Sequence, residues 1–304
     1  MIKYIHMQNE RMIIKILREI CQEEGYKLSL FSDGWLILIE NGEQKMFIHG
    51  YKFPNNDGAI CELCTDKSGM SDFLRAMGIP TVPHHYMFAL SGFDYNLSLA
   101  KNYLEEYGEL VIKPNNGTGG KNVERVKSID ELRDVLSYEF ISNSMLSVSP
   151  FLDIKAEYRT VIYNDIPIFT FEKERPFVIA DGKTSFSEYL AQNGYKTDRV
   201  IDYVPKKNEK ILLNWKHNLQ GGATPRLIES PDNKMLELVK SLRTVLGLSF
   251  ASVDIVKVDG EYYILEINSG VMTEHFAKSS SKNYELAKKA YKMAVNGYFD
   301  NKKI

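Results

Sequence analysis

Three oxygen-bearing side chains stand in a stretch that otherwise reads as two apolar strands. The stretch ASVDIVKVDGEYYILEINSG, residues 251–270, contains Asp254, Glu266 and Asn268. If its strands pair across the Asp-Gly turn at 259–260, the two carboxylates can lie near each other on one side of a sheet. Carboxylates that close repel, unless one is protonated or a cation lies between them. Mg²⁺ is such a cation, because it takes one or two protein carboxylates together with phosphate oxygens and water.

The period of the strands predicts which side chains share a face. Asp254 shares a face with Ser252 and Val256 in SVDIVKV. The same alternation in YYILEIN places Tyr262, Ile264, Glu266 and Asn268 together. The residues alone allow two interpretations: a magnesium site, or a solvated sheet face with scattered charges.

A metal that is half-coordinated by phosphates needs a phosphate cradle, and VIKPNNGTGGKNV, residues 111–123, offers one. Lys113 ends a predicted strand, where its side chain can act as a point charge. Gly117, Gly119 and Gly120 let backbone N–H groups approach phosphate oxygens. The loop matches neither GxxxxGK[ST] nor GxGxxG, so a plain flexible hairpin is the alternative.

A third feature is NWKHNLQGGATPRL, residues 214–227. Asn218 stands just before Gly221 and Gly222. The glycine pair lets the backbone come close to a ligand or bend sharply, and the asparagine can anchor a substrate or a metal-bound oxygen. Taken alone, the segment is an ordinary turn.

Composition excludes several classes of protein. The chain has 304 residues, 44% apolar and 26% charged, with a formal net charge of −2. This balance does not indicate a general nucleic-acid or membrane binder. No apolar run is long enough to span a bilayer, and the N-terminus MIKYIHMQNERM has no signal-peptide pattern, so we expect a cytoplasmic protein. The Cys61–Cys64 pair lacks a second pair for zinc, and ordinary reduced thiols are expected.

Helices and strands mix without strict alternation, which predicts an α+β fold rather than one doubly wound sheet. Apolar spacing predicts a first helix over 7–24, and Asn41-Gly42 predicts a hairpin turn. Further helices are expected to end at Gly78, Gly108 and Gly247, and a last amphipathic helix covers 281–298.

The order of the three features resembles that of the ATP-grasp ligases. The likeness is closest to the ATP-grasp portion of cyanophycin synthetase and of bifunctional glutathione synthetase, and it runs from about Thr65 to Glu274. It implies an ATP-grasp fold, in which a nucleotide lies between two α+β subdomains. By this likeness the domains are a short N-terminal domain (1–65), a subdomain with the glycine-rich phosphate loop (66–155) and a C-terminal subdomain with the magnesium site (156–304).

The resemblance also implies residue roles. CTDKSGMSDFLRAMGIPTVP and ELVIKPNNGTGGKNV are similar to the family's phosphate-lysine segments. AEYRTVIYND and EKERPFVIADGKTSFSEYL are similar to its arginine segments, and HNLQGGAT is similar to N-L-S-T-G-G. The implied catalytic residues are Arg159, Arg175 and Asn218. Implied nucleotide-binding residues are Lys67, Lys113, Gly117, Gly119, Gly120, Phe151 and Asp153. Implied metal ligands are Asp254, Glu266 and Asn268, and implied substrate-binding residues are Gly221, Gly222, Ser269 and His275.

Two segments depart from the family pattern. The adenine hinge usually carries two carboxylates, whereas VSPFLDI has Ser149 and Pro150 there. Backbone groups can still bind adenine, and Asp153 can replace the ribose contact. After Asn268 the family has a Pro-Gly turn that leads to a histidine; NSGVMTEHF keeps His275 but lacks the proline. The substrate therefore cannot be copied from the relatives.

The family chemistry implies an ATP-dependent carboxylate–amine ligase. It implies ATP and Mg²⁺, or Mn²⁺ in its place, and an amino acid, a peptide or a similar small acid as the substrate. The products would be an amide, ADP and phosphate, formed through an acyl-phosphate. A small-molecule kinase and a non-catalytic nucleotide-binding module are the alternatives. No nucleic acid or membrane partner is expected, and a homodimer is compatible with the family.

Overall fold

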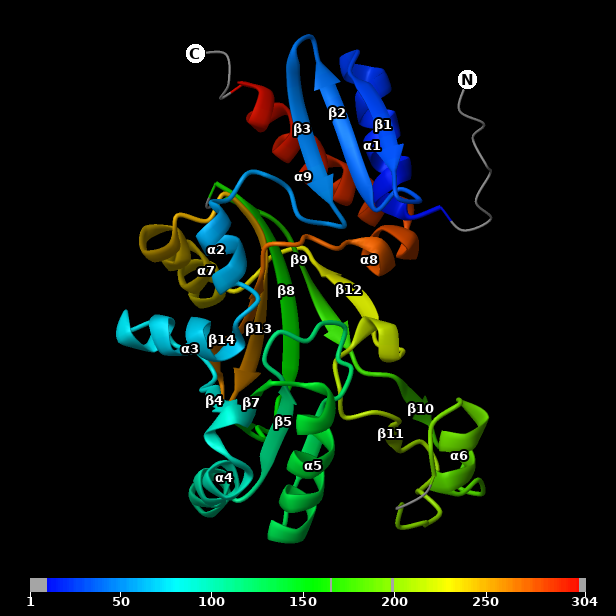
Figure 1. Cartoon of the computed structure of the whole chain (residues 1–304). Coiled ribbons are helices and arrows are strands. Elements are labelled where there is room, and N and C mark those ends of the chain that lie inside the picture. Colours follow the sequence, from blue (N-terminus) through cyan, green and yellow to red (C-terminus); the bar gives the residue numbers. More distant parts are fainter. Residues whose placement is uncertain (1–9, 165, 198–199, 301–304) are drawn as a thin grey trace.

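The computed structural model describes residues 10–164, 166–197 and 200–300 (Figure 1). The N-terminal MIKYIHMQN, with the first residues of the helix expected over 7–24, lies outside this part. The helices are α1 (Met12–Glu24), α2 (Gly58–Leu63), α3 (Lys67–Ala76), α4 (Phe93–Tyr107), α5 (Ile129–Ser142), α6 (Phe186–Gln192), α7 (Asn233–Leu246), α8 (Glu274–Ser279) and α9 (Ser281–Asp300), with short 3₁₀ turns η1 (Ala89–Ser91) and η2 (Leu219–Gly221).

Four antiparallel sheets hold the strands. Their strand orders are β1-β2-β3, β4-β7-β5-β6, β12-β9-β8-β13-β14 and β10-β11. The strands are β1 (Lys27–Phe31), β2 (Leu36–Asn41), β3 (Gln44–His49), β4 (His85–Phe88), β5 (Leu110–Pro114), β6 (Glu124–Val126), β7 (Met145–Pro150), β8 (Ala156–Tyr163), β9 (Ile166–Glu174), β10 (Phe177–Ile179), β11 (Lys210–Leu212), β12 (Thr224–Ile228), β13 (Phe250–Val258) and β14 (Glu261–Asn268). The α+β expectation is confirmed.

The five-stranded sheet forms the centre of the molecule, and its two faces differ (Figure 1). Odd-numbered residues of β13, such as Val253 and Ile255, lie in an apolar core with Leu242 of α7. Along β13 the other face is apolar at one end, where Phe250 is buried, and polar further on, at Asp254. The polar part of this face can therefore carry chemistry, while α7 stabilises the sheet from behind.

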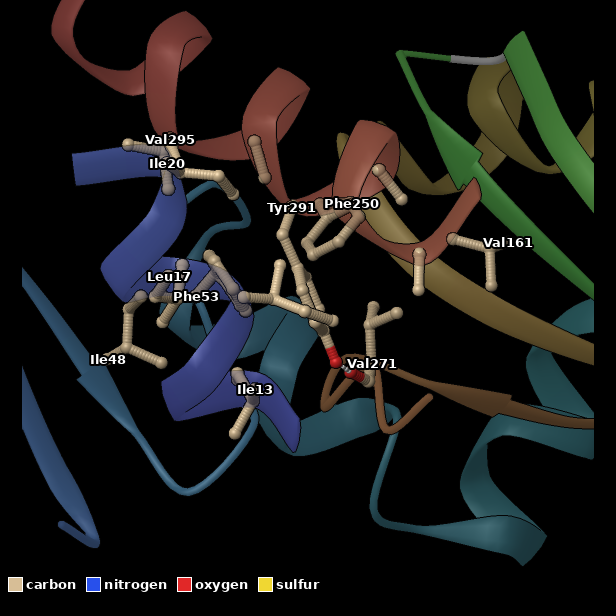
Figure 2. Close-up of a cluster of buried hydrophobic side chains, with 14 of the residues drawn as sticks. Ile13, Leu17, Ile20, Ile48, Phe53, Val161, Phe250, Val271, Tyr291 and Val295 are labelled. Carbon is tan, nitrogen blue, oxygen red and sulfur yellow. Dashed lines mark hydrogen bonds between the residues drawn. The ribbon is translucent and has the colours of Figure 1, made fainter. Parts of the chain in front are cut away.

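The N-terminal sheet packs on helices from both ends of the chain. Its inward side chains share one core with α1, α9 and the apolar end of the central sheet. Figure 2 shows the Tyr291 ring of α9 in this core, with its hydroxyl directed toward Val271, whose carbonyl accepts a hydrogen bond of 2.8 Å. Phe53 stacks on Tyr291 with ring centroids 5.4 Å apart. The domain boundary at residue 65 stays a prediction, but α9 and α1 belong to one core.

The four-stranded sheet carries the glycine-rich loop, which begins where β5 ends. Helices α4 and α5 cover one side of this sheet in a separate apolar core. Ser128 caps α5 by accepting from the Glu131 amide. Gly108 ends α4 with φ +77°, a conformation that glycine adopts without strain.

A short segment joins the two large sheets. The amide of Val82 donates to the carbonyl of Ile264, and the amide of Ile264 donates to the carbonyl of Pro80, both at 2.9 Å. The free edge of β14 is therefore covered, and β14 is fixed relative to the segment that leads into β4.

Candidate functional site

Asp254 and Glu266 face each other across the β13–β14 pair, as the sequence predicts. The register then shifts, because Ile255 pairs with Ile264 and leaves Leu265 as an extra residue of β14. This β-bulge reverses the alternation. Tyr262 and Ile264 lie in the apolar core with Ile255, on the side opposite Asp254. The expectation that they share a face with Glu266 and Asn268 is therefore wrong.

A buried histidine stabilises the bulge. His84 Nε2 lies 3.3 Å from the carbonyl oxygen of Leu265, and its Nδ1 lies 3.1 Å from the Ser147 hydroxyl. Since a carbonyl only accepts, Nε2 is the donor in this contact. Burial and the nearby Lys113 lower the pKa of His84 well below its usual value. A small cavity lined by His84, Lys67 and Glu266 lies directly beside the bulge.

Two cations from neighbouring strands neutralise Asp254. Arg159 of β8 donates from Nε and Nη2 to its two oxygens, both at 2.7 Å. Lys173 of β9 lies 2.9 Å from the same carboxylate and 2.6 Å from Glu157. All four side chains are nearly buried, so the two carboxylates and the two cations form a charge-balanced cluster.

The cluster shifts the pKa of its members. Burial alone would raise the pKa of Asp254, but Arg159 and Lys173 outweigh burial and lower the pKa to about 2. Burial lowers the pKa of Arg159, and the stronger attraction of Asp254 raises it above its usual value. Asp254 is therefore an anion at every ordinary pH, with three of its roughly four acceptor positions already used.

Glu266 is the carboxylate that remains available. Its side chain is half-buried and forms no ion pair or hydrogen bond with another residue of the described part of the chain. Two buried polar atoms beside it also lack partners within that part, Asn268 Nδ2 and Ser252 Oγ. Ser252 and Asn268 are paired across β13 and β14. Buried polar atoms without partners are rare, and they mark a place where a ligand can be bound.

Lys113 stands opposite this carboxylate at the end of β5. Burial lowers the pKa of Lys113 to about 8, although the attraction of Glu266 acts in the other direction. A lysine of this kind holds its proton weakly until an anion binds beside it. The expected phosphate lysine is therefore present in an environment that favours an added negative charge.

Lys67 holds the beginning of the glycine-rich loop. Its Nζ donates to the carbonyl oxygens of Asn115 at 3.2 Å and Gly117 at 2.6 Å. Asn115 is buried and ties the same loop to α3, because its side chain donates to Asp66 and accepts from the Ser68 amide. The loop is thus fixed to the start of α3, and Lys67 can reach a phosphate only by exchanging these partners.

Asn218 holds the other side of the loop. Its Nδ2 donates to the carbonyl of Gly119 at 2.8 Å. Gly119 and Gly120 have φ values of +71° and +69°. A Cβ on Gly120 would lie 2.5 Å from Asn218 Nδ2, and one on Gly119 would lie 2.8 Å from Gln220 Oε1. Both glycines therefore suit their backbone conformation, and at Gly120 the contact with the hydrogen-bonded Asn218 amide adds a second requirement.

Aromatic side chains surround the hinge. The guanidinium of Arg125 lies 3.5 Å from the ring centroid of Phe151. The Trp215 ring packs edge-on against Phe151, with the two ring centroids 5.5 Å apart. Asp153, the expected ribose contact, is exposed and pairs with Lys155. Rings at this place can pack against a flat base, while the ribose role of Asp153 stays a prediction.

Arg175 lies just beyond β9 and is half-buried. Its guanidinium forms no hydrogen bond or ion pair with the residues that the structure describes, although its charge helps to lower the pKa of Asp153. An arginine in this state can bind an anionic group directly. Its catalytic role stays a prediction.

The expected substrate residues are dispersed. Ser269 is buried, and its hydroxyl donates to the carbonyl of Cys61 at 3.4 Å. His275 is exposed in the first turn of α8, and no hydrogen bond joins its ring to another residue within the described ranges. Gly222 has φ +98°, and a Cβ there would lie 2.6 Å from the Tyr195 hydroxyl. The substrate assignments stay predictions.

Sequence analysis did not single out Lys173, Glu157, Asn115 or Trp215. Lys173 and Glu157 carried no local signal, because only the order of the strands brings β9 and β8 beside β13. Asn115 and Trp215 could have been noticed from their places in the sequence. Asn115 follows Pro114 in KPNNG, and Trp215 lies close to the Gly-Gly pair.

The donor set fits a hard divalent cation only in part. Within the described residues, no three His, Cys, Asp or Glu side chains converge on a common point. Glu266 and the amide of Asn268 can offer oxygen ligands, while Asp254 has about one acceptor position left. This suits Mg²⁺, which usually keeps waters and takes phosphate oxygens, better than a metal that needs a cage of protein ligands.

Comparison with known proteins identifies the family. The model of the ATP-grasp domain matches residues 64–274, more than two thirds of the chain. The chain therefore belongs to the ATP-grasp ligase superfamily. No curated protein sequence matches it. No helix in the described ranges is both long and apolar enough to cross a membrane.

Solved structures share the fold at low sequence identity. A bifunctional glutathione synthetase from Pasteurella multocida superposes with a TM-score of 0.55 and 15% identity, over 93% of this chain and 44% of that chain. A D-alanine–D-alanine ligase from Bacillus anthracis superposes with a TM-score of 0.51 and 19% identity, over 77% of this chain and 67% of that chain. The D-cycloserine synthetase DcsG superposes with a TM-score of 0.50 and 15% identity, over 78% of this chain and 73% of that chain. The chain thus spans less than half the length of the glutathione synthetase. The finer likeness to cyanophycin synthetase stays a prediction.

Proposed function

We propose that the chain is an ATP-dependent carboxylate–amine ligase that acts on an amino acid, a peptide or a similar small acid. The observation that carries this proposal is the arrangement of charged groups around the glycine-rich loop. A glycine-rich loop is held from both sides, with Lys113 beside it, and the Glu266 carboxylate, which has no ion pair within the described ranges, faces this region. The solved ligases that share the fold support the same reaction class. The nucleotide would lie between the subdomains formed by residues 66–155 and 156–304.

The reaction would have two steps. A substrate carboxylate oxygen attacks the γ-phosphorus of ATP, and ADP leaves, which gives an acyl-phosphate. An amine then attacks the acyl carbon, phosphate leaves and the nitrogen loses a proton, which gives the amide. Both steps bring anions together, so fixed positive charge is what the protein must supply.

Particular residues suit particular parts of this task. Lys113 and the loop amides bind the phosphates, and the rings of Phe151 and Trp215 pack on the base. The Arg175 guanidinium has no hydrogen bond or ion pair within the described part of the chain, so it suits the transferred phosphoryl group and the later oxyanion. Arg159 acts by keeping Asp254 ionised and in place. The glycine-rich loop excludes water, because an acyl-phosphate open to solvent would hydrolyse.

Glu266 and Asn268 would hold Mg²⁺, with Asp254 as a weaker third ligand. The bound cation would neutralise the phosphate oxygens and help to orient the triphosphate. Mn²⁺ prefers the same oxygen ligands and should replace it.

The test is a product analysis. Purified full-length protein is incubated with ATP, Mg²⁺ and a panel of amino acids and short peptides. The proposal expects ADP, free phosphate and a product whose mass equals acid plus amine minus water. AMP as the product contradicts it. ADP with a stable phosphoester indicates a kinase, and nucleotide binding without turnover over the whole panel indicates a binding module.

A further inference from the structure

A small lobe stands beside the candidate site, and one of its tyrosines contacts the Gly-Gly turn of that site. The lobe contains β10, β11 and α6 and has its own apolar core, to which Tyr189 and Leu190 of α6 belong (Figure 1). Tyr195 follows α6 directly. Its amide donates to the carbonyl of Leu190 at 2.9 Å, so the end of the helix fixes its backbone.

The side chain of Tyr195 packs against the apolar core of the lobe, and its hydroxyl reaches the Gly-Gly turn. Its hydroxyl donates to the carbonyl of Gly221 at 3.0 Å. A Cβ on Gly222 would lie 2.6 Å from the same oxygen, so only glycine leaves room for the tyrosine at this point. Contact and hydrogen bond together determine where the turn lies.

The position of the Gly-Gly turn also determines where Asn218 lies. The amides of Gly221 and Ala223 both donate to the carbonyl of Asn218, and the Asn218 side chain caps the 3₁₀ turn by accepting from the Gln220 amide. With its carbonyl and side-chain oxygen used in this way, Asn218 directs Nδ2 to the carbonyl of Gly119. A continuous chain of contacts therefore runs from the lobe to the glycine-rich loop.

We propose that Tyr195 is a positioning residue for the glycine-rich loop: its hydroxyl holds the turn at Gly221, and the turn holds Asn218 against Gly119. What the loop binds rests on the proposed function. The path itself rests on the hydrogen bonds. Tyr195 contacts the loop only through this turn, by its hydrogen bond to Gly221, so it acts on the glycine-rich loop through Asn218.

The experiment compares two tyrosines of the same lobe in the full chain. Tyr195→Phe removes the hydroxyl that reaches the turn. Tyr189→Phe is the matched control, because its hydroxyl accepts from the Asp181 amide at 2.9 Å and stays within the lobe. Amide hydrogen exchange of residues 115–122 is measured by mass spectrometry, and the affinity for ADP with Mg²⁺ by calorimetry.

The proposal expects Tyr195→Phe to speed exchange of the loop about fivefold and to weaken ADP binding by a similar factor, the usual effect of one lost hydrogen bond. Tyr189→Phe should change neither by more than about twofold. Asn218→Ala should reproduce the Tyr195→Phe effect, and the double variant should be no worse than Asn218→Ala alone.

Three results would overturn the proposal: unchanged loop exchange in Tyr195→Phe, unchanged loop exchange in Asn218→Ala, or full additivity in the double variant. Equal loop exchange in both tyrosine variants would also overturn it, since the effect would then come from loosening the lobe. The exchange comparison needs no nucleotide. If the wild-type chain binds no ADP, the proposed function fails, while the exchange data still decide the role of Tyr195.

Discussion

Asp254 and Arg159 lie opposite each other on neighbouring strands, and both carboxylate oxygens accept from the guanidinium at 2.7 Å. This pairing gives the expected metal ligand a second role, because the sheet holds the carboxylate ionised before any ligand arrives. Lys173 on the next strand adds a further bond to the same group. The site is therefore built into three adjacent strands of the central sheet.

Removing Arg159 should destabilise the fold. Arg159→Ala leaves the buried Asp254 with Lys173 as its remaining cation. Removing one partner of a buried ion pair lowers the free energy of unfolding by about 3 kcal/mol. Urea unfolding at pH 7 measures the change in the free energy of unfolding. Arg226→Ala is the matched control on the same sheet, because its pairs with Glu172 and Glu174 are exposed and should cost less than about 1 kcal/mol. Equal losses in the two variants would contradict the prediction.

Acid should remove the contribution of the Asp254 pair in a defined range of pH. The pKa of Asp254 is lowered in the folded chain, against a value of about 3.9 when unfolded. The unfolded state therefore binds the proton first, and the contribution is complete above about pH 5 and is lost as pH falls toward about 2. Wild type and Arg159→Ala are compared by thermal melting between pH 2 and 7. Their difference in stability should shrink at the acid end, and a constant difference would count against the pairing.

Glu266→Gln should abolish turnover while the fold persists. The carboxylate has no ion pair to lose within the described residues, so the free energy of unfolding should change by less than about 1 kcal/mol. The loss of the main anionic metal ligand should lower kcat at least about a hundredfold, a size typical of a lost electrostatic group. Titration with Mg²⁺ and Mn²⁺ follows the rate. Glu261→Gln, at the other end of β14 and paired with exposed Lys234, should behave as wild type.

The sequence predicted the parts of the site that local rules determine. The Asp-Gly turn was enough to predict the β13–β14 hairpin, but without a bulge this turn would pair Asp254 with Leu265, so it is the bulge that brings Glu266 opposite Asp254. The bulge at Leu265 was not predictable in this way, because His84 and the Pro80–Val82 segment stabilise it from a distant part of the chain.

Non-local contacts explain the other differences as well. Lys173 meets Asp254 only because the strand order is β9-β8-β13, which no local pattern reveals. In the same way, the apolar face of the final helix was visible in the sequence, but the sequence did not reveal that α1 would cover this face. Helix and strand periods determine elements, whereas the partner of each face depends on the whole topology.

Nucleotide binding should depend on the protonation of Lys113. The pKa of Lys113 is about 8 in the free protein, so the ammonium is present below pH 8 and is lost as pH rises through that value. Phosphate binds the charged form, and ADP affinity should therefore be constant below about pH 7 and fall about tenfold per unit above pH 8. Calorimetry in buffers of different ionisation enthalpy should show proton uptake. Lys113→Arg keeps its charge, so it should lose this dependence. A flat profile in the wild type would contradict the prediction.

Gly120→Ala should weaken nucleotide binding beyond its effect on stability. Alanine at φ +69° is strained by about 1 kcal/mol, and its Cβ would lie 2.5 Å from Asn218 Nδ2, which must then leave the Gly119 carbonyl. Gly108→Ala is the matched control, because φ is +77° there and no atom lies within 4 Å of the added carbon. Both variants should lose similar stability in urea, whereas only Gly120→Ala should weaken ADP binding, by about tenfold or more. Equal affinities in the two variants would mean that the contact between Asn218 and the loop does not shape the phosphate site.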